Sequence, residues 1–187
     1  MHFDTYSKSA ERTVVPLTDK KMNRSADGQS SSAHNRRPPI AVKSSTIHGK
    51  GVFATRKIAA DTRLIEYEGE RITEKQAAKR HGSDPDNPFH TFFFSLDNGR
   101  IIDGGIGGND ARWINHCCEP NCEAREEDGR IFIYALRDIR RGEELNYDYG
   151  LVLGERHTPA VKRAYGCRCG ASSCRHTMLA PKRKKSR

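Results

Sequence analysis

Three closely spaced cysteines near the C-terminus have the residue type and spacing of metal ligands. Cys167, Cys169 and Cys174 lie in the stretch CRCGASSC, whose glycine and small residues allow the backbone to wrap around an ion. A structural zinc site is tetrahedral and takes four thiolate or imidazole ligands, so these cysteines need one further partner. The candidates by residue type are Cys117, Cys118, Cys122 and His176. The sequence therefore predicts a zinc site, with free thiols as the alternative, and leaves the fourth ligand open.

Two other segments have residues suited to binding a small ligand. The run from Gly107 to His116 passes from glycines into polar residues, and Asn115 and His116 offer donors and acceptors for a ribose or a purine. The segment HGKGVF, residues 48–53, contains two glycines that permit a close approach of backbone to ligand. Each segment also has a simpler interpretation, a capped turn for the first and a tight hairpin turn for the second. The spacing of the second matches neither a P-loop nor a dinucleotide-binding fingerprint.

Tyr147 and Tyr149 are a candidate pair of phenols for chemistry. Side chains alternate along an extended strand, so these two fall on the same side. Half-buried packing is the alternative for this pair. Acidic residues also gather in two stretches, residues 66–74 and 119–128, which form either a field for a basic partner or an ordinary solvated surface.

The elements that must hold these residues are mainly short strands. Extended segments are expected at residues 52–54, 64–67, 92–96, 101–102, 131–136 and 145–149. Asn98-Gly99 predicts a tight hairpin turn, because this pair tolerates positive φ at both central positions. One helix is expected where Thr73 and Gln76 match a capping box, and Gly82 follows its end. The predicted fold class is therefore mainly β with few short helices.

The charge of the 187-residue chain is concentrated at its ends. Residues 1–39 contribute +3 and residues 181–187 contribute +5 of the formal net charge of +9, so residues 40–180 are nearly neutral. The N-terminal segment is rich in Ser, Lys, Arg and Asn without apolar periodicity, which predicts a disordered tail. No apolar run approaches the roughly 20 residues needed to span a bilayer, and no signal peptide is evident. An intracellular, reducing location is expected, where clustered cysteines favour metal binding over disulfides.

Taken together, these motifs resemble those of SET-domain protein lysine methyltransferases. GKGVFA (49–54) is similar to the family's first cofactor loop, and YEGE (67–70) to the strand motif that follows it. GNDARWINHCCEPN (108–121) resembles the RFINHSCxPN signature, ELNYDYG (144–150) the ELxYDY signature, and CRCGASSC the post-SET zinc module. The likeness covers about residues 40–180 in the family's order. It implies small β-sheets around a pseudoknot, in which the C-terminal strand passes under the loop with the Asn-His segment.

The resemblance also implies which residues bind the cofactor, S-adenosylmethionine. The backbone of Lys50 and Gly51 is expected to contact it, while Asn115 and His116 hold its amino-acid and adenine ends. Further cofactor contacts are implied for Val52, Tyr67, Phe92 and Arg112.

The catalytic and metal residues follow from the same resemblance. Tyr149 matches the catalytic tyrosine, and Tyr147 matches the position that governs how many methyl groups are added, from which mono- or dimethylation is expected. The structural zinc is implied to be bound by Cys118, Cys167, Cys169 and Cys174.

Some positions depart from the family's pattern. Cys117 stands where the signature has serine, and Trp113 where it has phenylalanine. Phe92 occupies the expected place of a tyrosine in the lysine channel, which bears on product specificity. No cysteine precedes Cys117 in this sequence, so the cysteine-rich pre-SET module of some subfamilies is not expected in it.

The chain is accordingly expected to be an S-adenosylmethionine-dependent enzyme that methylates the ε-amine of lysine in a basic protein, a histone or a bacterial histone-like protein. The nucleus and chromatin, the bacterial cytoplasm and nucleoid, or a host cell reached as a secreted effector are the expected locations. The basic tails suggest nucleic-acid contact through phosphates, and no membrane partner is expected. The alternatives are a catalytically silent SET-like module that serves as a chromatin adaptor and a small zinc-binding nucleic-acid protein. The expected parts are a tail (1–39), the SET domain (40–150), a linker (151–164), the post-SET zinc module (165–180) and a basic tail (181–187).

Overall fold

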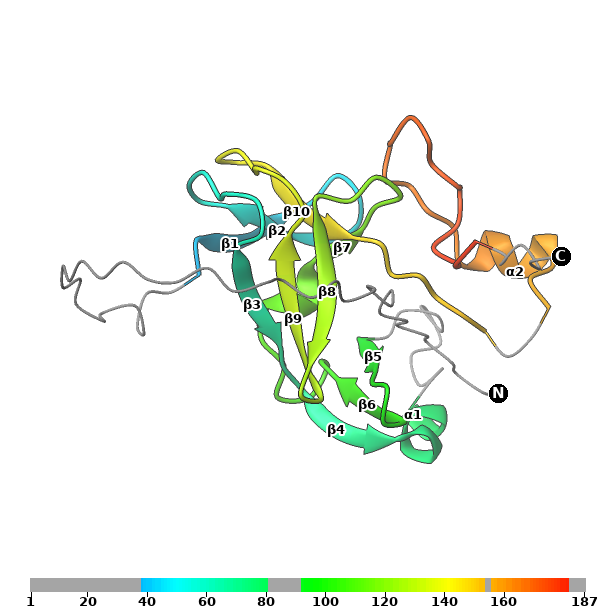
Figure 1. Ribbon diagram of the computed structural model, residues 1–187. Helices are drawn as coiled ribbons and strands as arrows, with labels where there is room; N and C mark the ends of the chain where they lie inside the picture. Colours follow the sequence, from blue (N-terminus) through cyan, green and yellow to red (C-terminus); the bar gives the residue numbers. More distant parts are fainter. Residues whose placement is uncertain (1–37, 81–91, 154–155, 182–187) are drawn as a thin grey trace, which may run out of the picture.

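The computed structural model describes residues 38–80, 92–153 and 156–181, in which short strands form three small sheets (Figure 1). The first has the order β1-β2-β10-β7, with bounds β1 Ile40–Ser44, β2 Lys50–Ala54, β10 Glu144–Tyr147 and β7 Asn115–His116. The second has the order β3-β9-β8, with bounds β3 Arg63–Tyr67, β9 Arg130–Ala135 and β8 Cys122–Glu127. The third has the order β4-β6-β5, with bounds β4 Glu70–Thr73, β6 Arg100–Asp103 and β5 Phe93–Ser95. The predicted mainly β class is confirmed.

The apolar side chains of the strands form one main core and one smaller cluster. The main core draws mainly on the first two sheets. Its best buried members, each at most 1% exposed, include Val52, Ile131, Ile133 and Leu145 from these strands, and Ile114, which precedes β7. Burying one such side chain contributes about 1.5–3 kcal/mol, so this core holds the two sheets together. The smaller cluster joins the third sheet to helix α1 (Glu74–Arg80) and consists of Ile72, Ala77 and Ile101 with Phe93 packed against them.

The start of α1 has the capping box that its sequence predicts. The Thr73 backbone N–H donates to Gln76 Oε1 at 2.9 Å, and the Gln76 backbone N–H donates to Thr73 Oγ1 at 3.3 Å. These two bonds satisfy donors that the first helical turn would otherwise leave without partners. The prediction of the helix start is confirmed.

The β5–β6 hairpin forms where Asn98-Gly99 predicts it, but its turn differs from the expectation. Gly99 has φ 77, whereas Asn98 is not among the residues with positive φ. The Gly99 N–H donates to the carbonyl of Leu96 at 3.0 Å, and the Leu96 N–H donates to that of Arg100 at 2.8 Å. The expected positive φ at both positions is therefore wrong, because the loop is a three-residue one in which only its last residue is left-handed.

The segment expected as a linker contains a second helix, α2 (Pro159–Ala164). Thr158 caps it, since its side chain accepts from the Val161 N–H at 3.2 Å, and Pro159 provides a favourable first position. Beyond the cysteines the chain returns to the segment that follows β10, where Leu151 and Leu179 form an isolated parallel bridge. In Figure 1 this C-terminal segment, coloured orange to red, lies to one side of the strands.

Some expectations fall outside the described residues. They concern the N-terminal tail up to residue 37, the position of Gly82, and the basic residues 182–187. Within the parts of the chain that the structure describes, no helix has both the length and the apolar character needed to cross a membrane.

Candidate active site and metal centre

Asn115 and His116, which are predicted to bind the cofactor, meet Tyr147 and Tyr149 where β10 lies between β2 and β7. β10 pairs antiparallel with β2 and parallel with β7, so Asn146 and Tyr147 lie opposite Asn115 and His116. This pairing brings together two segments that are distant in sequence, as the expected pseudoknot requires. β7 is the edge strand of its sheet, which leaves main-chain groups on its outer side for a ligand.

The Asn115 side chain is buried and ties this strand to its neighbours. Its Nδ2 donates to the carbonyl oxygens of Lys50 at 2.9 Å and His48 at 3.3 Å, and to Glu144 Oε1 at 2.8 Å. Glu144 in turn accepts from the Ser45 hydroxyl at 2.8 Å. Asn115 therefore fixes the turn between β1 and β2 against β10. Its side-chain amide nitrogen is engaged with protein acceptors, which favours a ligand contact through its backbone.

His116 connects residues 147–149, here called the tyrosine segment, to Cys118. Its Nδ1 accepts from the Tyr149 backbone N–H at 3.1 Å, and its Nε2 lies 3.4 Å from Cys118 Sγ. Burial lowers the pKa of His116 to about 4, so the ring is neutral at pH 7. Because Nδ1 accepts, the single ring proton is on Nε2, which donates to the sulfur.

Tyr147 and Tyr149 pack against each other with ring centroids 4.9 Å apart, so the predicted shared side is correct. The Tyr149 hydroxyl donates to the carbonyl of Ile114 at 2.8 Å, which fixes its direction. Burial raises the pKa of both phenols well above the ordinary value, so both stay protonated at neutral pH. A hydroxyl held in this way can orient a partner group but is a poor base.

Four of the residues expected to bind the cofactor gather around Trp113. The Phe92 ring meets the indole edge-on at 5.1 Å, and the Lys50 Nζ lies 4.6 Å from the indole centroid. The Arg112 guanidinium is 4.8 Å from that centroid, and Tyr67 donates its hydroxyl to the carbonyl of Phe92 at 2.8 Å. Arg112 Nε is buried and has no hydrogen-bond partner. An unpaired buried donor next to cationic side chains fits a ligand with a carboxylate.

Gly51 and Val52 contribute differently from each other. A Cβ at Gly51 would lie 2.3 Å from Glu144 Oε1 and 2.9 Å from Ser45 Cβ, so the absence of a side chain allows this close packing. Val52 is fully buried in the main core. Its side chain therefore has a packing role, and only its backbone remains for the predicted cofactor contact.

The C-terminal cysteines gather with one cysteine from the middle of the chain. The Sγ atoms of Cys118, Cys167, Cys169 and Cys174 all lie within 4.8 Å of one another. Of the candidates for the fourth ligand, only Cys118 belongs to this group among the described residues. Cys117 is buried with its pKa raised to about 11, mainly by burial, and Cys122 is fully buried in the core.

The geometry of this cluster fits zinc. Tetrahedral coordination at about 2.3 Å per thiolate separates the sulfurs by about 3.8 Å. Cys118 Sγ lies 3.8 Å from that of Cys167 and 3.9 Å from that of Cys174. Backbone N–H groups of Cys169, Arg175 and His176 donate to sulfurs of the cluster at 3.3–3.4 Å. Such donors stabilise thiolates, which are the form that binds zinc.

Comparison with known proteins agrees with this geometry. A family model described as "SET domain" matches residues 49–150. The chain belongs to the SET-domain family.

Its relatives include named histone-lysine methyltransferases. It is 41% identical over 145 residues to "Histone-lysine N-methyltransferase, H3 lysine-4 specific" of Candida albicans, a match that covers 75% of this chain and 14% of that protein. It is 38% identical over 140 residues to "Histone-lysine N-methyltransferase trithorax" of Drosophila melanogaster, covering 73% and 4%. It is 39% identical over 140 residues to human "Histone-lysine N-methyltransferase 2B", covering 73% and 5%. The chain thus spans between 4% and 14% of the length of these relatives.

The acidic stretches of this SET domain are less negative than their sequence suggests. Four glutamates of these stretches form ion pairs with arginines among the described residues, in the pairs Glu66–Arg130, Glu70–Arg80, Glu123–Arg125 and Glu127–Arg63. Glu119 instead accepts from the hydroxyl of Ser172 at 3.0 Å and from the N–H of Ser173 at 2.8 Å. These pairs favour the ordinary solvated surface over a strong field for a basic partner.

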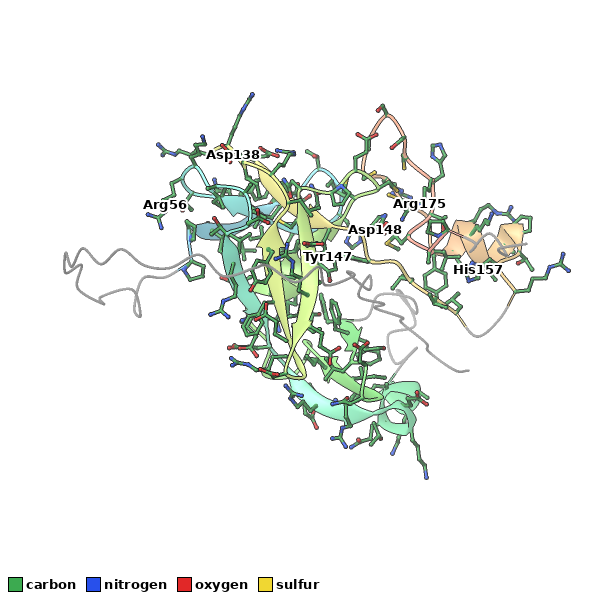
Figure 2. The ribbon with its side chains drawn as sticks, viewed as in Figure 1. Arg56, Asp138, Tyr147, Asp148, His157 and Arg175 are labelled. Carbon is green, nitrogen blue, oxygen red and sulfur yellow. The ribbon has the colours of Figure 1, made fainter. Side chains whose placement is uncertain are left out.

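Glu144, Asp148 and Arg175 shape the SET-domain site, although the sequence did not predict them to be part of it. Glu144 holds Asn115, and Asp148 contacts Arg175 at 2.7 Å next to the cysteines (Figure 2). Glu144 and Asp148 lie within the signature 144–150, so their positions carried a signal. Arg175 directly follows Cys174 and had no signal of its own.

Proposed function

We propose that this SET domain transfers methyl groups from S-adenosylmethionine to the ε-amine of a lysine in a histone. The observation that carries the proposal is the meeting of Tyr147 and Tyr149 with the Asn115–His116 strand, in a chain about 40% identical to named histone-lysine methyltransferases. Because histones reside in chromatin, a nuclear location is part of the proposal.

The cofactor is proposed to lie between the outer edge of β7 and the cluster around Trp113. Arg112 Nε and the Lys50 ammonium offer charge for its carboxylate, and the backbone of Asn115 and His116 offers hydrogen bonds. When bound, S-adenosylmethionine supplies an electrophilic methyl group that a neutral amine can accept directly. Zinc, held by the four clustered cysteines, is proposed to have a structural role.

The chain's own task is to present the lysine as a neutral, oriented amine. Lysine has a reference pKa of about 10.4, so removing its proton costs about 4.6 kcal/mol at pH 7. The buried aromatic surroundings of Tyr147 lower this cost, because desolvation disfavours the ammonium form. Tyr149, protonated and tied to the Ile114 carbonyl, is proposed to orient the amine through its oxygen rather than to remove its proton.

Mono- or dimethylation is the proposed outcome. Tyr147 is buried, with its ring 6.3 Å from that of Phe94 and 4.9 Å from that of Tyr149. A hydroxyl in such a confined place leaves little room for an amine that already carries methyl groups.

Methyl transfer from radiolabelled S-adenosylmethionine to histones tests the proposal. We expect transfer by the wild type and a loss of about 100-fold or more in kcat for Tyr149→Phe, because the orienting hydroxyl is removed. Leu136→Ala is a control, since the Leu136 side chain is exposed and lies outside the segments 108–121 and 144–150. A well-folded wild type that binds S-adenosylmethionine yet transfers nothing would instead support the catalytically silent adaptor.

A further inference from the structure

The cysteine module at residues 165–180 meets the tyrosine segment through an ion pair. Arg175 Nη2 donates to Asp148 Oδ1 at 2.7 Å, and both side chains are partly buried, at 25% and 34% exposure. Figure 2 shows Asp148 beyond the end of β10, facing the C-terminal segment that carries Arg175. Asp148 stands between Tyr147 and Tyr149 in sequence, and the same oxygen accepts from the Gly150 N–H at 3.0 Å. The carboxylate therefore both shapes the local turn and contacts the module.

This contact closes a ring of interactions between the two parts of the site. The Arg175 backbone N–H donates to Cys118 Sγ at 3.4 Å, and His116 Nε2 lies 3.4 Å from the same sulfur. His116 accepts from the Tyr149 backbone N–H at 3.1 Å, and Asp148 precedes Tyr149 in the chain. A displacement of the module at Arg175 is thus transmitted to the backbone that carries Tyr149.

The ion pair is not needed to complete the metal cluster. The side chains of Asp148 and Arg175 supply none of the four sulfurs, and Cys118 is the ligand that lies outside the module. Ser172 and Ser173 donate to Glu119, and Leu179 bridges Leu151, so the module also meets the rest of the chain at these points. A contact with the residue between Tyr147 and Tyr149 ties the module to the tyrosines themselves. Asp148–Arg175 supplies that contact as a charge-assisted hydrogen bond.

We propose that Asp148 and Arg175 are positioning residues that hold the cysteine module in a fixed orientation against the catalytic strand, separately from zinc binding. The effect on methyl transfer rests on the proposed function, whereas the effect on the module does not. The ligand expected to sense the orientation is the cofactor, which is proposed to bind at the Asn115–His116 edge.

A double-mutant cycle on the zinc-loaded full chain tests this pair. Arg175→Gln removes the charge, and Asp148→Asn removes the partner charge but keeps an oxygen for the Gly150 N–H. For each single variant we expect one zinc per chain, as in the wild type, and a Kd for S-adenosylhomocysteine raised about fivefold in calorimetry. The double variant should be no weaker than either single variant, because both remove the same interaction. Arg175→Lys should recover part of the loss.

Arg168→Gln is the matched control, since Arg168 lies in the same module, is exposed and forms no ion pair among the described residues. Additive effects of the two substitutions, an unchanged Kd, or zinc loss in parallel with the weaker Kd would each overturn the proposal. Should the wild type bind no S-adenosylhomocysteine, the proposed function fails, and hydrogen exchange of residues 165–180 decides the positioning role. Faster exchange in Arg175→Gln than in Arg168→Gln supports that role, and equal exchange refutes it.

Discussion

His116 shows how a single side chain joins two parts of the site that carry different chemistry. Its Nδ1 accepts from the backbone of Tyr149 and its Nε2 donates to Cys118 Sγ, so both ring nitrogens are used within the protein. The ring is buried and its pKa is about 4, so it stays neutral at pH 7, and the Tyr149 N–H at Nδ1 places the ring proton on Nε2. The cysteine cluster and Tyr149 are therefore bridged by one rigid ring.

At the same scale, the Tyr147 hydroxyl is predicted to limit the number of methyl groups added. Tyr147→Phe removes one oxygen from a buried site and leaves the aromatic packing with Phe94 and Tyr149 in place. We expect the main product to gain at least one methyl group, measured by mass spectrometry of a histone peptide after complete turnover. A wild type that already gives mostly trimethyl-lysine would contradict this account.

Glu143 is predicted to make folding stability depend on acid pH. Burial alone would raise the pKa of this carboxyl, but hydrogen bonds from the Arg137 side chain, the Arg140 N–H and Asn121 outweigh it and lower the pKa to about 2. A carboxyl whose pKa falls on folding stabilises the protein fully above its unfolded pKa of about 4.5, and loses this effect as the pH drops towards 2.

The measurement for Glu143 is urea unfolding of the wild type and Glu143→Gln from pH 7 to pH 3. We expect the variant to be about 2 kcal/mol less stable at pH 7, after allowance for solvent screening, and the difference to shrink below pH 4.5. Glu68→Gln is the control, because Glu68 is exposed and makes no hydrogen bond or ion pair in the described part of the chain. A difference that stays constant down to pH 3 would refute the assignment.

At the scale of elements, local rules succeeded where the determining residues are close in sequence. The capping box of α1 depends on Thr73 and Gln76, three positions apart, and forms as predicted. The position of the turn at Gly99 was predicted correctly, but its conformation was not. The turn type depends on the length of the loop as well as on the residue pair. α2 was missed because none of its residues is buried, so it has no apolar face for a sequence pattern to reveal.

The pairing of β2 with β10 leads to a prediction about Gly51. A methyl group there would lie 2.3 Å from Glu144 Oε1 and 2.9 Å from Ser45 Cβ, so Gly51→Ala must displace the carboxylate that accepts from Asn115. We expect a loss of about 1–3 kcal/mol in unfolding free energy, together with weaker cofactor binding. Gly49→Asn should change stability by less than about 0.5 kcal/mol. At Gly49 the φ of 45 suits asparagine and no atom lies within 4 Å of an added Cβ. Equal stability of the two variants would contradict the packing argument.

At the scale of the whole molecule, the contacts that sequence reasoning did not find join residues far apart in the chain. Asn115 and Glu144 are 29 positions apart, and Asp148 and Arg175 are 27 apart. No local periodicity reports such pairs, because they exist only after β10 has inserted between β2 and β7. Most of the site residues that the motifs predicted lie together in the structure. The ion pairs that neutralise the acidic stretches could be identified only from the folded chain.

Zinc is predicted to join the C-terminal module to the rest of the molecule through Cys118. Its sulfur lies 3.8–3.9 Å from those of Cys167 and Cys174, whereas Cys117 is buried and hydrogen-bonded to Glu119. Cys118→Ser should lower zinc affinity at least about 100-fold, because it removes a residue that is predicted to bind the metal directly. Cys117→Ser should retain one zinc per chain.

Because the main core contains none of the four ligands, removal of zinc should release the module without unfolding the sheets. After chelation we expect faster hydrogen exchange at residues 165–180 and at Cys118, with β9 and β2 still protected. Methyl transfer should fall together with this protection, since Arg175 would no longer be held near Asp148. Zinc content by mass spectrometry and exchange on the same samples check this. Loss of protection in β9 on chelation would show instead that the metal stabilises the whole fold.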